Sequence, residues 1–223
     1  LLHRFFGWRG INVDASSEAI ALFNKERPND INIKAAVGPE GAERDFWVFN
    51  EPATNTLSEE NKERQLLEGK KIRRKEKMVT RTLVNILDEY LPENQEIDFL
   101  NIDVEGLDFE VLKTNDWEKY RPKVVLIEDY TIKTSGLNNS NIYQYMKNKG
   151  YYFFSQAFDT TIYIEKEFSK EWEKTENTSF DHFEKSWMES PELYQRANYL
   201  MQAHPEWNNI IEKIDHLNRQ LIN

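Results

Sequence analysis

The stretch Ile97-Asp98-Phe99-Leu100-Asn101-Ile102-Asp103-Val104-Glu105-Gly106 decides the fold. A short apolar run ends in two carboxylates and a glycine, a pattern typical of a central strand that runs into a turn. Side chains two residues apart on an extended chain point to the same side, so Asp103 and Glu105 should face one space. Their repulsion would raise one pKa and create a base, or the pair would bind a divalent cation through its oxygens. The alternative is a solvated acidic turn in which Asp108 caps the next helix.

Strand and helix patterns alternate on both sides of this stretch. Upstream, the sequence predicts strands over 10–15, 31–38, 46–49 and 78–83, with helices over 18–27 and 83–91. Downstream, it predicts helices over 108–113 and 142–149, a buried strand over 123–128, and a hairpin over 151–154 and 161–164. Such alternation is typical of a doubly wound α/β sheet.

The last part of the chain has a different pattern. Strand signals stop near residue 166, which divides the sequence into a domain over 1–166 and a helical C-terminal extension over 167–223. Apolar residues at helical spacing between Trp207 and Leu221 predict an amphipathic helix. We expect this helix to pack on the domain or to join two copies of the chain.

Composition excludes several classes of protein. The 223 residues carry a net charge of -10, contain 39% hydrophobic residues and include no cysteine. This hydrophobic content is too high for a disordered chain, and no apolar run approaches the roughly 18–20 residues of a membrane helix. A disulfide scaffold, a thiolate zinc site and a cysteine nucleophile are excluded, and the acidic balance argues against binding nucleic acid. We expect a cytoplasmic protein.

Three acids come at the carboxyl ends of predicted strands, where ligands of open α/β sheets bind. They are Asp14, Asp103 and Glu128. An acid in the position of Asp14 can accept hydrogen bonds from both hydroxyls of a ribose; alternatively, it serves only a turn or a helix cap. The four histidines lie away from strand ends, so neither a histidine base nor a zinc site is expected.

The segments Gly7–Asp14, Phe49–Ser58 and Ile97–Gly106 together resemble the FkbM-type methyltransferases. The resemblance covers about 1–166 and continues through Trp117–Val124. It implies a Rossmann-like class I fold and an S-adenosylmethionine-dependent O-methyltransferase that acts on hydroxyls of sugars, glycans or natural products.

The resemblance also implies roles for individual residues. Asp14, with Ala15 beside it, corresponds to the acid that binds the cofactor ribose, and Ala36 and Val37 to the segment along the adenine. Asp103 and Glu105 fall at the active-site strand end, where we expect them to orient or deprotonate the acceptor and Asp103 to touch the cofactor. No metal is expected.

The remaining candidates concern the acceptor. Asn50, Asn55 and Ser58 form a polar loop that either covers the cleft and binds a hydroxylated substrate or is a plain surface turn. Glu128 is expected to bind the acceptor from its strand end. The run Lys70–Lys77 concentrates six cations in eight residues and either attracts an acidic acceptor or is a solvated, mobile loop.

One departure from the family is large. The glycine-rich loop after the family's first strand, which cradles the methionine half of the cofactor, is absent from this sequence. Loss of that central strand would leave two unpaired sheet edges, so we expect the natural protein to continue upstream with an apolar strand and a glycine-containing turn. Two alternative functions stay open: a non-catalytic binding or scaffold protein, and an enzyme that uses a nucleotide-sugar.

Overall fold

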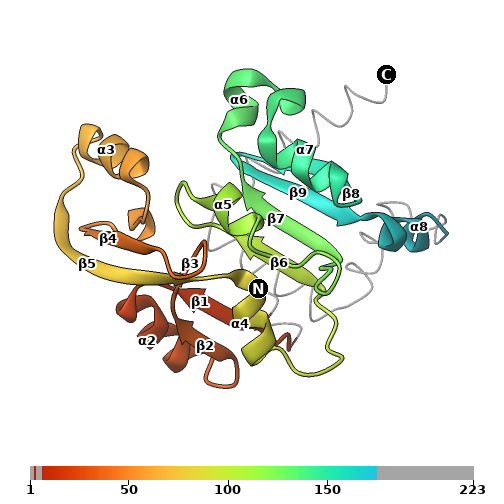
Figure 1. Cartoon of the computed structure of the whole chain (residues 1–223), viewed down its shortest axis with the longest axis horizontal. Coiled ribbons are helices and arrows are strands. Elements are labelled where there is room, and N and C mark those ends of the chain that lie inside the picture. Colours follow the sequence, from red (N-terminus) through yellow and green to blue (C-terminus); the bar gives the residue numbers. More distant parts are fainter. Residues whose placement is uncertain (1–2, 4–6, 175–223) are drawn as a thin grey trace, which may run out of the picture. The chain divides into compact units, whose positions relative to one another are not determined.

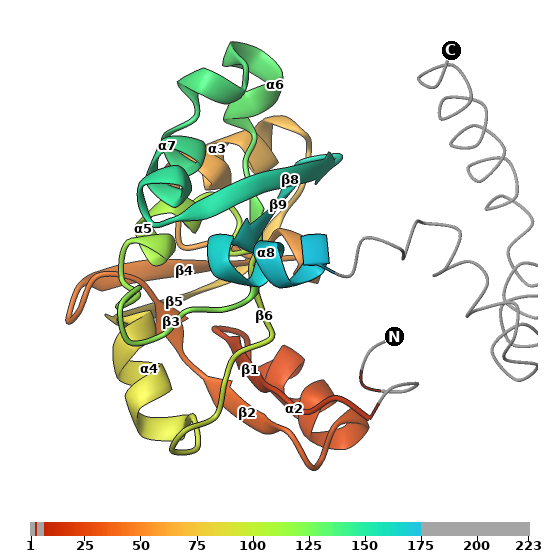
Figure 2. The ribbon, with the colours of Figure 1, turned by 90° about the vertical axis from the view of Figure 1, so that its right-hand side faces the viewer.

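The computed structural model describes His3 and residues 7–174 (Figure 1). The mixed α/β class is confirmed, but the described strands form three sheets rather than the single sheet that the alternation predicts. Figures 1 and 2 show β1 and β2 towards one end of this part and β8 and β9 towards the other.

The first sheet contains two parallel strands, β1 (Ile11–Asp14) and β2 (Ile31–Lys34). The helix between them, α2 (Ser17–Glu26), packs on both strands. Ser16 caps this helix, because its Oγ accepts a hydrogen bond from the Ala19 amide at 3.3 Å. The cap fixes the direction of the chain as it leaves Asp14.

The second sheet has the order β3-β5-β4. Its strands are β3 (Ala36–Val37), β4 (Glu43–Phe49) and β5 (Ile72–Arg81), and β4 runs antiparallel to β5. The long β4–β5 connection carries the 3-10 turn η1 (Pro52–Thr54) and the helix α3 (Glu59–Leu67). Figure 1 shows α3 at the far end of this hairpin. The helix α4 (Leu83–Tyr90) follows β5.

The third sheet has the order β6-β7-β9-β8. Its strands are β6 (Phe99–Ile102), β7 (Val124–Glu128), β8 (Tyr151–Ala157) and β9 (Thr160–Glu165). The connections contain α5 (Asp108–Leu112), α6 (Thr131–Ser135), the 3-10 turn η2 (Leu137–Asn139) and α7 (Asn141–Asn148), and α8 (Lys166–Lys174) follows β9. Strands β6 and β7 are parallel, so their carboxyl ends meet at one edge of the sheet.

Two apolar clusters support that edge. The larger one lies between the third sheet and its helices, and includes Ile102, Leu112, Trp117, Val125 and Ile127. A smaller one joins Ala36, Phe46, Val48, Leu57 and Leu107. Because Val104 packs against both clusters, the turn after β6 is anchored between them.

The basic run does not form the expected loop. Ile72–Lys77 belongs to β5, which begins six residues before the predicted strand. Asp45 lies opposite Lys77 in register and forms ion pairs with Lys75 at 2.6 Å and Lys77 at 2.9 Å. Arg74 pairs with Glu18 and with Glu76, both at 2.7 Å. Pairing with acids across the strands lets this charged segment extend along β4, and leaves less free charge for an acidic ligand.

Strand β6 is also less central than its apolar sequence predicts. It pairs with β7 on one edge only, and within His3 and residues 7–174 no strand pairs with its other edge. Phe99 is accordingly 38% exposed. Residues 117–120 form a turn held by Asp116, whose Oδ1 accepts from the amides of Glu118 and Lys119.

The C-terminal extension lies outside the described residues from 175 onward, including the predicted amphipathic helix between Trp207 and Leu221. Within the part that is described, no helix combines the length and apolarity needed to cross a membrane.

Candidate functional site

The site begins where the backbone leaves β6. Val104 points into the core, so its neighbours Asp103 and Glu105 face away from it. The turn that follows needs unusual backbone angles, because φ is +56° at Glu105 and +101° at Gly106. A positive φ is costly for a residue with a side chain, so the position of Glu105 depends on contacts that hold the turn.

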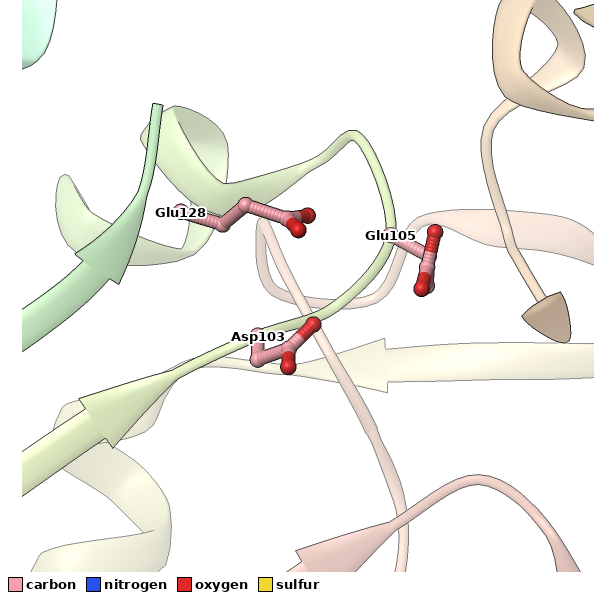
Figure 3. Close-up of side chains that lie close together, drawn as sticks. All are labelled: Asp103, Glu105 and Glu128. Carbon is pink, nitrogen blue, oxygen red and sulfur yellow. The ribbon is translucent and has the colours of Figure 1, made fainter. Parts of the chain in front are cut away.

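The structure brings Asp103 and Glu105 together with Glu128 from the end of β7. One carboxylate oxygen of each residue lies within 4.8 Å of the others. Figure 3 shows the three side chains around one space at the carboxyl ends of the two parallel strands. Such spacing also suits a divalent cation, but exposed acidic groups commonly gather without one, and the absence of a metal stays a prediction.

Helix α3 and the loop before it hold the turn from outside. The amide Nδ2 of Asn61 donates to the backbone oxygen of Glu105 at 2.5 Å and to its Oε2 at 3.1 Å. The Thr56 hydroxyl donates to the same backbone oxygen at 2.7 Å. A Cβ on Gly106 would lie 3.2 Å from the Asn61 Cβ and 3.4 Å from that of Ser58. Glycine at this position lets the turn and α3 approach closely without a tight contact.

A buried carboxylate closes the turn from the other side. Asp108, which is 5% exposed, accepts hydrogen bonds from the amides of Val104 and Gly106, each at 3.0 Å. Burial raises the pKa of Asp108 to about 6 despite these bonds. It is the first residue of α5 rather than the helix cap that the alternative interpretation expects. Asp108 thus stabilises the turn through hydrogen bonds to its backbone.

Burial also changes the carboxyl groups that face the shared space. It raises the pKa of Glu128 to about 7, and the charges of Asp103, Asp108 and Glu105 raise it further, while hydrogen bonding by Tyr130 opposes the shift. Burial raises the pKa of Glu105, which the Asn61 amide partly reverses. The site therefore holds a carboxyl group that gains or loses its proton near neutral pH.

A cation and an aromatic ring lie beside these acids. The Arg64 guanidinium stacks on the Tyr130 ring, 4.6 Å from its centroid, and its charge favours ionisation of Glu105. Gln65 Nε2 donates to Oδ1 of Asn61 at 3.0 Å, and Lys70 Nζ donates to Oε1 of Gln65. Through these polar contacts, residues of α3 are connected to the turn after β6.

Asp14 lies at the end of β1, as predicted. Its Oδ1 accepts from the Ser16 amide at 2.7 Å, so the helix-start role is real, while Oδ2 has no partner within the described part of the chain. Burial raises the pKa of Asp14. This carboxylate therefore has one oxygen anchored and one available to accept a hydrogen bond from a ligand.

The other predicted cofactor residues differ in exposure. Ala36 is 1% exposed and belongs to the smaller apolar cluster. Ala15 and Val37 are half-buried, so Val37 offers more surface than Ala36 to an adenine ring.

The polar loop residues have structural partners. Asn55 accepts from the Phe49 amide and Asn50 from the Lys71 amide, both at 2.8 Å. Ser58 caps α3 by accepting from the Asn61 amide at 3.2 Å. All three bonds fix the β4–β5 connection, and contact with an acceptor stays a prediction.

A hollow of about 240 Å³ lies on β4 and β5, lined by Trp47, Leu57 and the charged residues around them. None of the three clustered carboxylates lines it. Its acidic Asp45 and basic Lys77 neutralise each other, so it does not define the reacting centre.

Sequence reasoning missed Asn61, Thr56, Arg64 and Tyr130. Ser58 followed by Glu59 and Glu60 is a helix-start signal that indicates α3. The helix has too few apolar residues for a periodic pattern, and nothing in the sequence indicates that a polar helix packs against the turn at Glu105.

Comparison with known proteins identifies the family of the chain. No curated protein and no solved structure matches the chain significantly. The model of the methyltransferase FkbM domain matches residues 1–153, a range that contains Asp14, the turn after β6 and Glu128. The chain therefore belongs to the FkbM methyltransferase family.

Proposed function

We propose that this protein is an S-adenosylmethionine-dependent O-methyltransferase that acts on a hydroxyl group of a sugar, glycan or natural product. The observation that carries the proposal is the meeting of three carboxylates at the ends of two parallel strands, inside the segment that matches the family. Ligands of open α/β sheets bind at such strand ends.

Asp14 would hold the cofactor by accepting hydrogen bonds from its ribose hydroxyls through Oδ2. When bound, S-adenosylmethionine supplies a methyl group on a positively charged sulfur, which leaves as a neutral thioether. Asp14 and Asp103 lie far apart in the sequence, but both belong to one structural unit, Leu1–Ser169.

The acidic cluster would serve the acceptor. An ionised carboxylate accepts hydrogen bonds and donates none. Asp103 and Glu105 would therefore orient an acceptor hydroxyl by accepting a hydrogen bond from it. Positioning of this kind supplies much of the acceleration when two reactants are held together. Asn61 and Asp108 keep the turn, and with it Glu105, in place.

Titration calorimetry of the intact protein with S-adenosylmethionine, and separately with NAD, tests the cofactor. We expect heat of binding with S-adenosylmethionine alone. Incubation with methyl-labelled cofactor and a set of glycosides, followed by mass spectrometry, tests O-methylation. Binding of neither ligand would favour a scaffold protein, and binding of UDP-glucose in a third titration would favour the enzyme that uses a nucleotide-sugar.

A further inference from the structure

The carboxyl groups around the turn differ in what they already bind. Oε2 of Glu105 accepts from Asn61, and the two oxygens of Asp108 accept from two backbone amides. Both residues are committed to holding the turn. A carboxylate that already accepts hydrogen bonds is a weaker base, because those bonds stabilise its charged form.

Asp103 differs in a second way, because it is exposed. Water solvates an exposed carboxylate and competes with the acceptor for its oxygens. Asp103 can therefore orient a hydroxyl only in competition with water.

Glu128 accepts a hydrogen bond from Tyr130, but it differs from the others in its second oxygen. Its Oε2 is buried and has no hydrogen-bond partner among the residues that the structure describes. Figure 3 shows its carboxyl group directed from the end of β7 towards the space that it shares with Asp103 and Glu105. An unpartnered buried oxygen gains a hydrogen bond only when a ligand supplies one.

The groups around Glu128 favour its protonated form. Asp103, Glu105 and Asp108 repel a negative charge there, and Tyr130, with Arg64 stacked on its ring, is the neighbour that opposes them. The resulting pKa of about 7 matches the range in which a general base works best at neutral pH.

We infer that Glu128 is the catalytic base of the proposed methyl transfer and takes the acceptor proton on Oε2. The acceptor O–H bond breaks, its electron pair stays on the acceptor oxygen for the bond to the methyl carbon, and the proton forms a new O–H bond on Glu128. The proton then leaves to water. This inference rests on the proposed function.

The pH dependence of methyl transfer separates Glu128 from its neighbours. With methyl α-glucopyranoside at high concentration as the probe acceptor, the rate of the intact wild-type protein should fall about tenfold per pH unit below pH 7. Glu128→Gln should lower the rate at pH 8 about a hundredfold or more and remove that pH dependence. Asp103→Asn and Glu105→Gln should keep the pH dependence but shift it to lower pH, because each removes a repelling charge. Glu60→Gln, at an exposed position of α3, is the control.

A second measurement needs no acceptor. In protein labelled with ¹³C at the glutamate carboxyl carbons, one NMR signal should titrate near pH 7 and be lost in Glu128→Gln but not in Glu60→Gln. A Glu128 signal that titrates near pH 4.5 would overturn the inference, as would wild-type transfer by Glu128→Gln. If Glu128→Gln binds S-adenosylmethionine in titration calorimetry and also transfers the methyl group at the wild-type rate, only the assignment of Glu128 as the base fails. If the wild-type protein binds no S-adenosylmethionine, the proposed function itself fails.

Discussion

The side-chain amide of Asn61 donates to both the backbone oxygen and the carboxylate of Glu105, 44 residues further along the chain. One neutral side chain thus fixes the left-handed turn and the orientation of the acid that the turn presents. Asn61 is 4% exposed, so no water can take its place without a change in packing.

Replacement of Asn61 should therefore affect both stability and the site. Asn61→Ala leaves buried polar groups with fewer partners, and we expect a loss of about 2 kcal/mol of unfolding free energy. Asn61→Asp replaces the donor with a second carboxylate, so its loss should be greater at pH 8 than at pH 5. Urea unfolding at the two pH values measures both, with Glu60→Gln expected within about 0.5 kcal/mol of wild type. Equal stability of Asn61→Ala and wild type would contradict the structure.

Gly106→Ala tests how closely the turn fits α3. The new Cβ would meet Asn61 and Ser58 at 3.2 and 3.4 Å, and φ is +101°. We expect a loss of more than about 2 kcal/mol, from backbone strain and contact together. Gly41→Ala is the matched control, since Gly41 has φ +69° but no atom within 4 Å of the added Cβ. Gly41→Ala should lower the unfolding free energy by about 1 kcal/mol. Similar losses of unfolding free energy for the two variants would show that the contact with α3 is unimportant.

Asp14→Ala should weaken cofactor binding without unfolding the protein. It removes charge-assisted hydrogen bonds to the ribose, each worth about 1.5–3 kcal/mol, so affinity for S-adenosylmethionine should fall at least tenfold. The melting temperature without ligand should fall by only a few degrees, because the Ser16 amide loses its acceptor. Calorimetry and thermal unfolding of the intact protein measure these, and unchanged affinity would leave Asp14 only the hydrogen bond to Ser16.

Stability should decrease as the pH rises from 5 to 8. The pKa values of Asp108 and Glu128 are raised to about 6 and about 7 in the folded protein, above those of the unfolded chain. Their contribution is therefore fully present below about pH 4 and is lost as the pH passes through 6 and 7. For the buried Asp108, the loss is on the order of 2 kcal/mol.

Urea unfolding between pH 5 and pH 8 measures this loss. In this range the lowered pKa of Glu18, about 2, does not contribute. Glu128→Gln should reduce the loss of stability at high pH, whereas Glu60→Gln should leave it unchanged. A stability that rises with pH would show that the two carboxyls are not buried as the structure has them.

The sequence predicts most of the α/β elements because their signals are local. Ser16 before α2 and the apolar run 124–128 act through neighbouring residues and the hydrophobic pattern, and both appear in the structure. The start of β5 could not be predicted, since Arg74, Lys75 and Lys77 are stabilised in a strand by acids on other elements.

Only part of the candidate site has local signals in the sequence, so only that part is predictable. Asp103 and Glu105 are indicated by their place after a strand, and Glu128 by the next parallel strand. Asn61 and Tyr130 could not be found, because their contacts depend on how α3 and the residues after β7 lie in space.

The contacts that shape Glu105 come from a short segment, Thr56 to Asn61, between two strands of another sheet. Apart from a single bridge between Trp47 and Thr56, this segment takes no part in strand pairing. An insertion or deletion there would change the reach of α3 over the acids while leaving every strand register intact. The geometry of the acidic turn therefore depends on a connection whose length the strand pairing does not fix.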